Sequence, residues 1–181
     1  MGTDVPDVPR GVRLFVAVYP SAAALDHVAA FAAGLDLGPR PAPRASLHVT
    51  IAFLGEAPPA PALAAIETAA SATGPFDLRL VGGGSFTGRG STVLWAGVAA
   101  PALDGLAATV RRELDRYGVG YDDRPFRAHL TLGRLPEPVE PQLAALSAYS
   151  GPVSTIDSLA LVSSLPGPDV AYEDLASWPL R

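Results

Sequence analysis

Two histidines, His48 and His129, lie 81 positions apart in the same short pattern, His-x-Thr with apolar residues on both sides. Side chains alternate between the two faces of an extended strand, so each histidine shares a face with the threonine two residues later, Thr50 or Thr131. The opposite, buried face is expected to carry the apolar residues Leu47, Val49, Ile51, Phe53, Leu130 and Leu132.

These residue types suit acid and base chemistry on a phosphodiester. A histidine with an unperturbed pKa near ~6.5 can donate or accept a proton near neutral pH. One histidine can activate water while the other protonates the leaving oxygen, provided the two flank the phosphorus. The hydroxyls of Thr50 and Thr131 can donate hydrogen bonds to the two nonbridging oxygens. The pattern predicts phosphodiester hydrolysis that needs no metal ion.

Other interpretations of the histidines are weaker. A lone His-x-Thr is more often an ordinary core or surface feature, and it is the shared phase of two copies that favours catalysis. A zinc site is disfavoured because the chain has no His-x-His, no His-Glu-x-x-His and no cysteine. The third histidine, His27, falls off the apolar stripe of its expected helix and is interpreted as solvent-exposed, without a role.

Composition excludes several classes of protein. The chain has 181 residues and no cysteine, which excludes disulfides, thiolate metal sites and a cysteine nucleophile. All 13 basic residues are arginine, so an ATP-dependent ligase that carries a nucleotide on lysine is excluded. The net charge of −5 argues against a broad basic surface, so any contact with nucleic acid is expected to be short and local. No apolar run approaches the ~20 residues of a membrane span.

We expect one domain over residues 1–181 that acts as a monomer, without a cofactor or membrane contact. The cytoplasm is the expected location, since residues 1–6 do not resemble a secretion signal.

Hydrophobic periodicity outlines the order of elements. The second half of the chain echoes the first, so we infer a duplicated α+β unit whose halves face each other with one His-x-Thr strand on each wall. Two copies packed side by side are the alternative. Strands are expected over 13–19, 47–53, 76–81, 91–98, 126–135, 156–163 and 170–178, and helices over 25–35, 58–70, 101–117 and 139–146.

A glycine-rich segment, residues 82–90, separates two of these strands. It lacks the Gly-x-Gly-x-x-Gly spacing of a phosphate-binding loop and runs into a strand rather than a helix, so it is interpreted as a hairpin-like connection. Phe86 and Arg89 on this segment are candidates for stacking on a base and for contacting a phosphate. Ordinary loop anchoring is the alternative for both.

The motif strands and their surroundings resemble the 2H phosphoesterases. Among these they are most similar to the bacterial and archaeal RNA 2′,3′-cyclic phosphodiesterases, also called 2′-5′ RNA ligase-like proteins. The likeness extends over nearly the whole chain and lies in residues 13–18, 47–56, 93–98, 126–134 and 172–180.

The resemblance implies a fold and a reaction. The fold is bilobal, with two mostly antiparallel sheets flanking a central cleft and helices outside. The reaction opens a 2′,3′-cyclic phosphate at an RNA 3′ end and leaves a 2′-phosphate. By the family pattern His48 is the acid and His129 the base, although the sequence alone does not order them.

The resemblance also extends the set of site residues. Arg134, five positions after His129, corresponds to a family arginine that contacts phosphate. Strict alternation places it on the opposite face from His129, so this role requires a bulge near Gly133. Phe86 and Tyr172 complete the expected substrate-binding set.

The chain departs from the family in two places. Ala128 stands where the family usually has proline. Residues 40–45 replace an aromatic-containing segment and are interpreted as a flexible linker, with charged contacts from Arg40 and Arg44 as the alternative.

Three alternatives for the function stay open. In the first, the enzyme acts on a different cyclic phosphate, such as a small nucleotide or an ADP-ribose derivative. In the second, the same site joins RNA ends by ATP-independent 2′-5′ ligation. In the third, the protein binds RNA ends without catalysis. RNA ends with a 2′,3′-cyclic phosphate are the expected partner.

Overall fold

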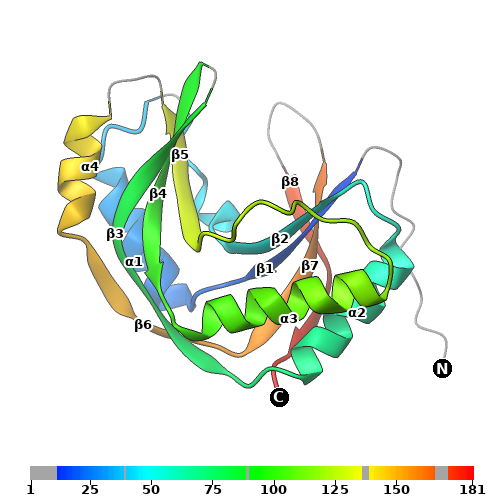
Figure 1. Cartoon of the computed structure of the whole chain (residues 1–181). Coiled ribbons are helices and arrows are strands. Elements are labelled where there is room, and N and C mark those ends of the chain that lie inside the picture. Colours follow the sequence, from blue (N-terminus) through cyan, green and yellow to red (C-terminus); the bar gives the residue numbers. More distant parts are fainter. Residues whose placement is uncertain (1–11, 39, 89, 136–138, 166–170) are drawn as a thin grey trace.

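The computed structural model describes residues 12–181 apart from 39, 89, 136–138 and 166–170. Strands and helices alternate along the chain (Figure 1). The strands are β1 (Arg13–Val18), β2 (Val49–Gly55), β3 (Phe76–Gly88), β4 (Ser91–Ala99), β5 (His129–Leu135), β6 (Ser150–Ile156), β7 (Ser158–Leu165) and β8 (Ala171–Pro179). The helices are α1 (Ala22–Ala33), α2 (Pro59–Ser71), α3 (Ala102–Arg116) and α4 (Glu140–Ser147), with a short 3-10 turn at Arg44–Ser46.

These strands form one antiparallel sheet in the order β6-β3-β4-β5-β2-β1-β7-β8. The α+β class and the antiparallel pairing are confirmed, but the expected two sheets are the two halves of a single one. The halves meet where β2 pairs with β5 through Val49 and Leu130. The motif strands are therefore neighbours, and not on facing walls. Pairing at this point removes two free strand edges from the middle of the molecule, which favours one sheet over two.

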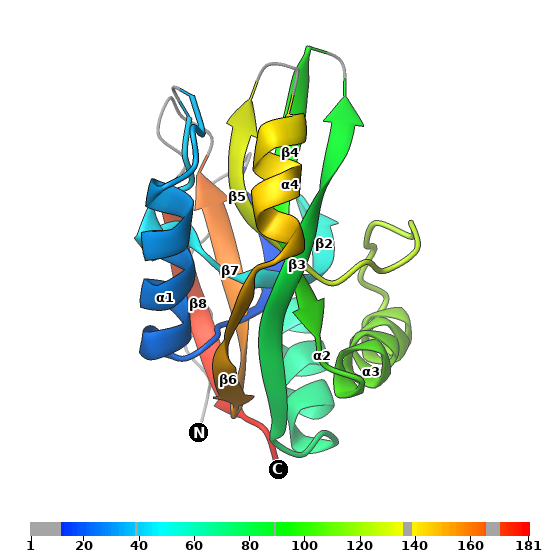
Figure 2. The same cartoon turned by 90° about the vertical axis from the view of Figure 1, so that its left-hand side faces the viewer.

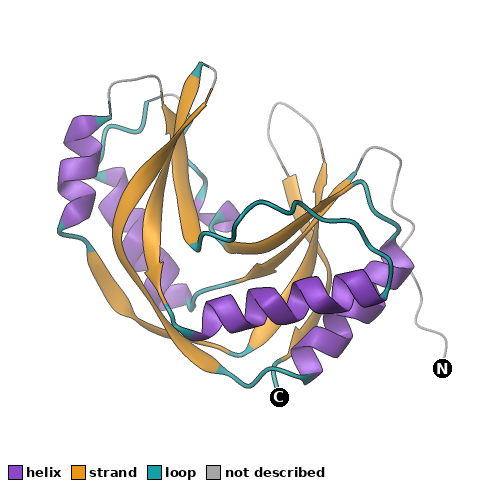
Figure 3. Cartoon of the chain, viewed as in Figure 1, coloured by secondary structure: helices purple, strands orange, loops and turns teal. Residues whose placement is uncertain are grey.

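Two of the helices pack against the half of the sheet that does not contain the strand before them. Helix α1 follows β1 but packs against β6, and α3 follows β4 but packs against α2 and β2. Helix α2 packs against β7 and β8, and α4 against β3. Each half of the sheet therefore carries one helix from each half of the chain (Figures 2 and 3).

The main core lies between the helices and one face of the sheet. Leu14, Val16, Val49 and Leu130 belong to it and are fully or almost fully buried. Phe15 belongs instead to a smaller buried cluster on the opposite face. That opposite face also carries the histidines and is called the histidine face below.

One core expectation is wrong: Phe53 is 49% exposed. Between Val16 and Ala17 the pairing of β1 with β2 shifts, because Ala17 opposes Thr50 while Val16 opposes Ala52. Strand β2 thus has a bulge at Ile51, and a bulge reverses the alternation beyond it. The reversal turns Phe53 away from the core.

The glycine-rich segment belongs to a hairpin, as expected, but most of it is strand and not loop, because β3 continues to Gly88 and pairs there with Ser91 of β4. A Cβ on Gly83 would lie 2.5 Å from the carbonyl oxygen of Trp95, and one on Gly84 would lie 2.4 Å from the Trp95 ring. Glycine is required here because β4 and its tryptophan approach the β3 backbone closely.

Strand β6 was not expected from the sequence. The expected strand over 156–163 corresponds to β7, which begins at Ser158, whereas Ile156 ends β6. Strand β6 contains Gly151 and Pro152 and shows no regular apolar alternation. It lies at the edge of the sheet, the position where proline is tolerated.

Candidate active site

The two histidines occupy equivalent places around the centre of the sheet. His129 is the first residue of β5, and His48 immediately precedes β2. Their successors Leu130 and Val49 form the antiparallel pair that joins the halves. Antiparallel strands run in opposite directions from such a pair, so His48 lies beside Thr131 and His129 beside Thr50. The structure brings both His-x-Thr motifs together.

The backbone holds both imidazoles in the same way. The Nδ1–H of His48 donates to the carbonyl oxygen of Ser46, and the Nδ1–H of His129 donates to that of Arg127, each over 2.7 Å. A carbonyl only accepts, so Nδ1 carries a proton in both rings. The second nitrogen, Nε2, is therefore the atom that gains or loses a proton in each histidine.

The threonine of the first motif is already bonded to its histidine. Thr50 Oγ1 lies 3.2 Å from Nε2 of His48. Because Nδ1 of His48 carries the proton of the neutral ring, the Thr50 hydroxyl donates this bond. Nε2 of His48 is therefore unprotonated in the neutral state, and its lone pair accepts this bond.

Burial lowers the pKa of both histidines. For His48 the Ser46 carbonyl opposes this effect, the charge of His129 lowers the pKa further, and the carboxylate of Asp174 raises it. For His129 the Arg127 carbonyl opposes burial, and the Arg127 guanidinium adds to the lowering. The mutual effect of the imidazoles means that protonation of one disfavours protonation of the other.

Aromatic rings surround His48. Phe15 stacks on its imidazole with ring centroids 4.8 Å apart, and Tyr172 meets it edge-on at 5.2 Å. Tyr19 lies at 6.3 Å in a similar edge-on geometry. Phe15 is buried beneath the imidazole and supports it, whereas Tyr172 is 39% exposed. The predicted residue Tyr172 thus lies at the site.

A second aromatic pair flanks His129. Phe86 meets its ring edge-on at 4.9 Å, and Trp95 lies at 6.1 Å. The Arg127 guanidinium lies over the Phe86 ring, 5.5 Å from its centroid. The predicted residue Phe86 is therefore next to His129, on strand β3 and not on a loop.

A pocket of about 390 Å³ opens beside His48. It is lined by Tyr19, Ala45, His48, Tyr172 and Asp174. The Tyr19 hydroxyl donates to Oδ1 of Asp174 over 2.6 Å, and burial together with this carboxylate raises the pKa of Tyr19. Tyr19 therefore stays protonated and holds the carboxylate at the pocket.

A somewhat larger pocket, of about 420 Å³, lies elsewhere. It is formed by α1, residues 35–38, and Pro41, Ala42, Arg44, Leu47 and Leu132, and neither His48 nor His129 lines it. Its lining includes no histidine, so the smaller pocket beside His48 is the candidate site.

The bulge that Arg134 requires is present. Trp95 opposes Thr131 while the preceding Leu94 opposes Gly133, which leaves Leu132 unpaired. This shift reverses the alternation, so Arg134 is exposed and the next residue, Leu135, is buried. Arg134 lies on the histidine face of β5.

The two bulges are equivalent, but the residues that they expose are not. Ile51 and Leu132 each follow the motif threonine. The residue two positions further is Phe53 in the first half and Arg134 in the second. At this equivalent position, the first half of the site has an aromatic ring and the second half a guanidinium.

Residues 40–45 are anchored to the fold by several bonds, whereas a flexible linker was expected. Arg44 forms an ion pair with Asp26 of α1 at 2.5 Å. The Ala42 N–H donates to the Leu132 carbonyl, and the Arg134 N–H donates to the carbonyl of Arg40. The segment therefore packs along the bulge of β5.

Two residues named in the sequence analysis are not part of the site as described. His27 is exposed, as expected, and its Nδ1 lies 3.0 Å from the Tyr149 hydroxyl, away from both motifs. Arg89 falls outside the described residues.

Several site residues were not expected from the sequence. Tyr19 and Asp174 line the pocket, and Arg127 and Trp95 lie at His129. Strand alternation offered one signal, since Asp174 lies two residues after Tyr172 and shares its face. Nothing in the sequence pairs Asp174 with Tyr19, which is 155 positions away.

Metal-binding and membrane-spanning features are not found in the part of the chain that the structure describes. It has no group of three or more histidine, aspartate or glutamate side chains that could hold a metal ion. None of its helices is long and apolar enough to cross a membrane.

Comparison with known proteins gives consistent matches. Residues 19–167 match the model of the 2′-5′ RNA ligase superfamily. The chain is 31% identical to an RNA 2′,3′-cyclic phosphodiesterase of Geobacillus stearothermophilus over 74% of this chain and 45% of that protein. It therefore spans less than half the length of that relative. It is 32% identical to a Thermus thermophilus protein of the same name over 80% of this chain and 77% of the relative.

A solved structure shares the fold. E. coli LigT complexed with 3′-AMP superimposes with a TM-score of 0.73 at 27% sequence identity. The superposition includes 93% of this chain and 97% of LigT. The likeness therefore extends through both halves of the sheet.

Proposed function

The chain belongs to the 2′-5′ RNA ligase superfamily, and from this premise we propose that it hydrolyses a terminal 2′,3′-cyclic phosphate on RNA to a 2′-phosphate. The observation that carries the proposal is the equivalent pair of imidazoles at the Val49–Leu130 junction, each with its Nδ1 bound to a carbonyl. The relatives named RNA 2′,3′-cyclic phosphodiesterase support the substrate class.

The proposed reaction uses one histidine as base and the other as acid. Nε2 of His129 accepts a proton from water as the water oxygen bonds to phosphorus. Nε2–H of His48 donates a proton to the 3′ oxygen as its bond to phosphorus breaks. The product carries a 2′-phosphate and a free 3′ hydroxyl. Proton exchange with solvent then restores both histidines.

The threonines and Arg134 are proposed to hold the phosphate. The Thr50 and Thr131 hydroxyls donate to its nonbridging oxygens, so Thr50 must exchange its bond to His48 for one to the substrate. Arg134 contributes a charge from the histidine face of β5. Phe86 and Tyr172 are proposed to contact the nucleoside, since both are at the imidazoles.

The domain organisation, oligomeric state, partner and location of the enzyme are part of the same proposal. Both histidines come from one chain and one sheet, so we propose that residues 1–181 act as a single domain and a monomer. RNA with cyclic phosphate ends is the proposed partner, through a short local contact, and the cytoplasm is the proposed location.

The direct test is a reaction with an RNA oligomer that ends in a 2′,3′-cyclic phosphate, in the presence of EDTA. The expected product is the same oligomer with a 2′-phosphate, which a nonspecific phosphatase removes but an enzyme specific for 3′-phosphates does not, whereas the cyclic ester resists both. An unchanged RNA oligomer would overturn the proposal. Hydrolysis of a cyclic mononucleotide alone would move it to small nucleotides.

A further inference from the structure

The two histidines have the same backbone setting but different charged neighbours. The charged or titratable side chains that face His48, among the described residues, are Asp174 and Tyr172 of β8, Tyr19 directly after β1, and His129. Those that face His129 are His48, Arg127 and, further along β5, Arg134. A carboxylate therefore lies beside His48, and a guanidinium lies beside His129.

Resting on the proposed function, we infer that Asp174 and Arg127 are positioning residues that assign the two roles, His48 as the acid and His129 as the base. An anion beside His48 favours the imidazolium that the acid must be before the reaction. A cation beside His129 favours the neutral ring that the base must be. The backbone alone would leave the roles interchangeable.

The geometry around Asp174 supports a fixed charge at this place. Its carboxylate lines the 390 Å³ pocket together with the His48 imidazole. The Tyr19 hydroxyl donates to Oδ1 over 2.6 Å, and no ion pair joins Asp174 to an arginine in the described part of the chain. The negative charge is thus held in position by a neutral donor and is not cancelled by a cation.

The geometry around Arg127 places a positive charge at the second histidine. Its carbonyl accepts from Nδ1 of His129 over 2.7 Å, and its guanidinium lies over the Phe86 ring that meets His129 edge-on. The two contacts use different parts of the residue. Replacing the side chain therefore removes the charge and leaves the carbonyl that orients the imidazole.

Burial disfavours the charged form of both imidazoles, and desolvation is the largest influence on the pKa of each. At His48 the Asp174 carboxylate opposes this effect, whereas at His129 the Arg127 guanidinium adds to it. The two side chains therefore act on the two rings in opposite directions, as the two roles require.

The first test titrates the histidines by NMR in the full chain without substrate. We expect His48 to titrate at a higher pH than His129. Asp174→Asn should lower the pKa of His48 and leave that of His129 almost unchanged, and Arg127→Met should raise the pKa of His129. Glu173→Gln, which removes a carboxylate from the adjacent residue on the other face of β8, should move neither.

A second, milder substitution tests the same contact in case Asp174→Asn does not fold. Tyr19→Phe keeps the ring beside His48 and removes only the hydroxyl that holds Asp174. It should lower the pKa of His48 by less than Asp174→Asn does. Unchanged titration of His48 in both variants would overturn the inference, as would a wild-type protein in which His129 titrates at the higher pH.

The second test separates the two roles by the leaving group. A phosphodiester that releases p-nitrophenolate needs no proton on its leaving oxygen, so it bypasses the acid. His48→Ala should then lose much less activity on this ester than on the RNA cyclic phosphate, whereas His129→Ala should lose activity on both. The opposite pattern would reverse the assignment. The NMR titration needs no substrate, so it remains decisive even if the RNA reaction fails.

Discussion

His48 and His129 are held as two copies of one device, with a carbonyl on Nδ1 and an aromatic ring beside the imidazole. Fixing Nδ1 leaves Nε2 as the nitrogen that exchanges a proton in both copies, which the proposed acid and base catalysis requires.

Removal of either imidazole should therefore be severe. His48→Ala and His129→Ala should each lower kcat on the cyclic phosphate by about 10²–10⁴, and the double variant should lose little more, because both act in one step. Steady-state kinetics on the RNA oligomer measure this. The matched control is His27→Ala, which should keep full activity. Substantial activity in the double variant would contradict the catalytic assignment.

The lowered pKa values of the two histidines predict the direction in which kcat/KM changes with pH. Burial lowers the pKa of both histidines below 6.5. The reaction needs one ring protonated and one neutral, so kcat/KM should fall once the pH rises above both pKa values. We expect an optimum below pH 6.5 in a kcat/KM profile. An optimum above neutral pH would show that burial does not control these rings in the free enzyme.

At the scale of elements, two bulges and a close strand contact shape the site. The bulges at Ile51 and Leu132 turn Phe53 and Arg134 onto the histidine face. The approach of β4 to Gly83 and Gly84 seats Trp95 beside His129.

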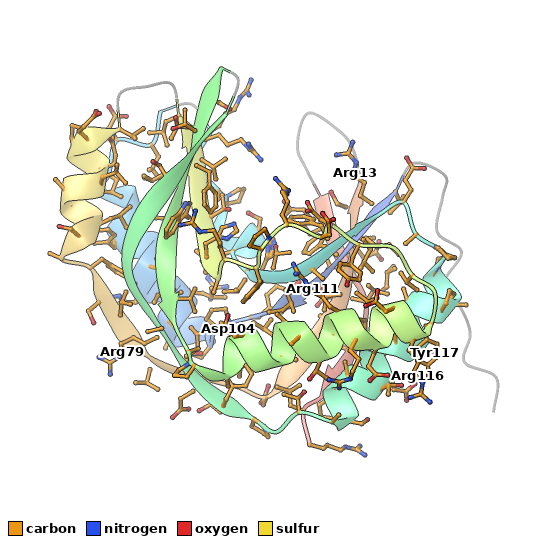
Figure 4. The ribbon with its side chains drawn as sticks, in the orientation of Figure 1. Arg13, Arg79, Asp104, Arg111, Arg116 and Tyr117 are labelled. Carbon is orange, nitrogen blue, oxygen red and sulfur yellow. The ribbon has the colours of Figure 1, made fainter. Side chains whose placement is uncertain are left out.

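The bulge of β5 places Arg134 on the histidine face, so we expect its side chain to contribute to activity. Arg134→Met should lower kcat/KM by about tenfold to a hundredfold, the size expected for a lost charge-assisted hydrogen bond of roughly 1.5–3 kcal/mol. The melting temperature should hardly change, since the side chain is exposed. Arg79→Met, on the outer part of β3 (Figure 4), is the control and should leave kcat/KM unaltered. Equal effects of the two variants would remove Arg134 from the site.

The close contact of β3 with Trp95 is tested by a pair of glycine variants. Gly84→Ala should destabilise the protein by about 1–3 kcal/mol through overpacking and lower activity by displacing Trp95. Gly105→Ala, in α3 where a Cβ meets nothing within 4 Å, should stabilise it by about 0.5–1 kcal/mol. Urea denaturation and tryptophan fluorescence measure both. A neutral Gly84→Ala would mean that the indole moves freely.

At the scale of the whole molecule, the two halves share one core although a single residue pair joins their strands. Residues of both halves, among them Val49, Leu130 and Leu78, belong to the same buried cluster. The crossing of α1 and α3 reinforces this, because each half of the sheet is covered by a helix from the other half of the chain.

Unfolding should therefore be cooperative. Leu130→Ala should destabilise the protein by about 2–5 kcal/mol, because it opens a cavity at a fully buried position at the junction. One transition should remain in urea, detected alike by tryptophan fluorescence and by circular dichroism. Val153→Ala on β6, where the side chain is 49% exposed, should change little. Separate transitions for the two halves would show that the lobes fold independently.

Local patterns in the sequence predicted the proposed chemistry and most of the elements. Two copies of His-x-Thr in one phase were sufficient to predict the acid and base pair, the hydroxyl donors and the buried partners Val49 and Leu130. This is possible because strand alternation and helical spacing are local properties of the chain.

How these parts meet follows from the tertiary structure and not from the local pattern. The pairing of Val49 with Leu130 produced one sheet where two were expected, and the bulge at Ile51 reversed the expected burial of Phe53. The Tyr19–Asp174 pair joins residues 155 positions apart. Register, bulges and such long-range pairs depend on which strands become neighbours, and that is settled by the packing of the whole core, which no local pattern contains.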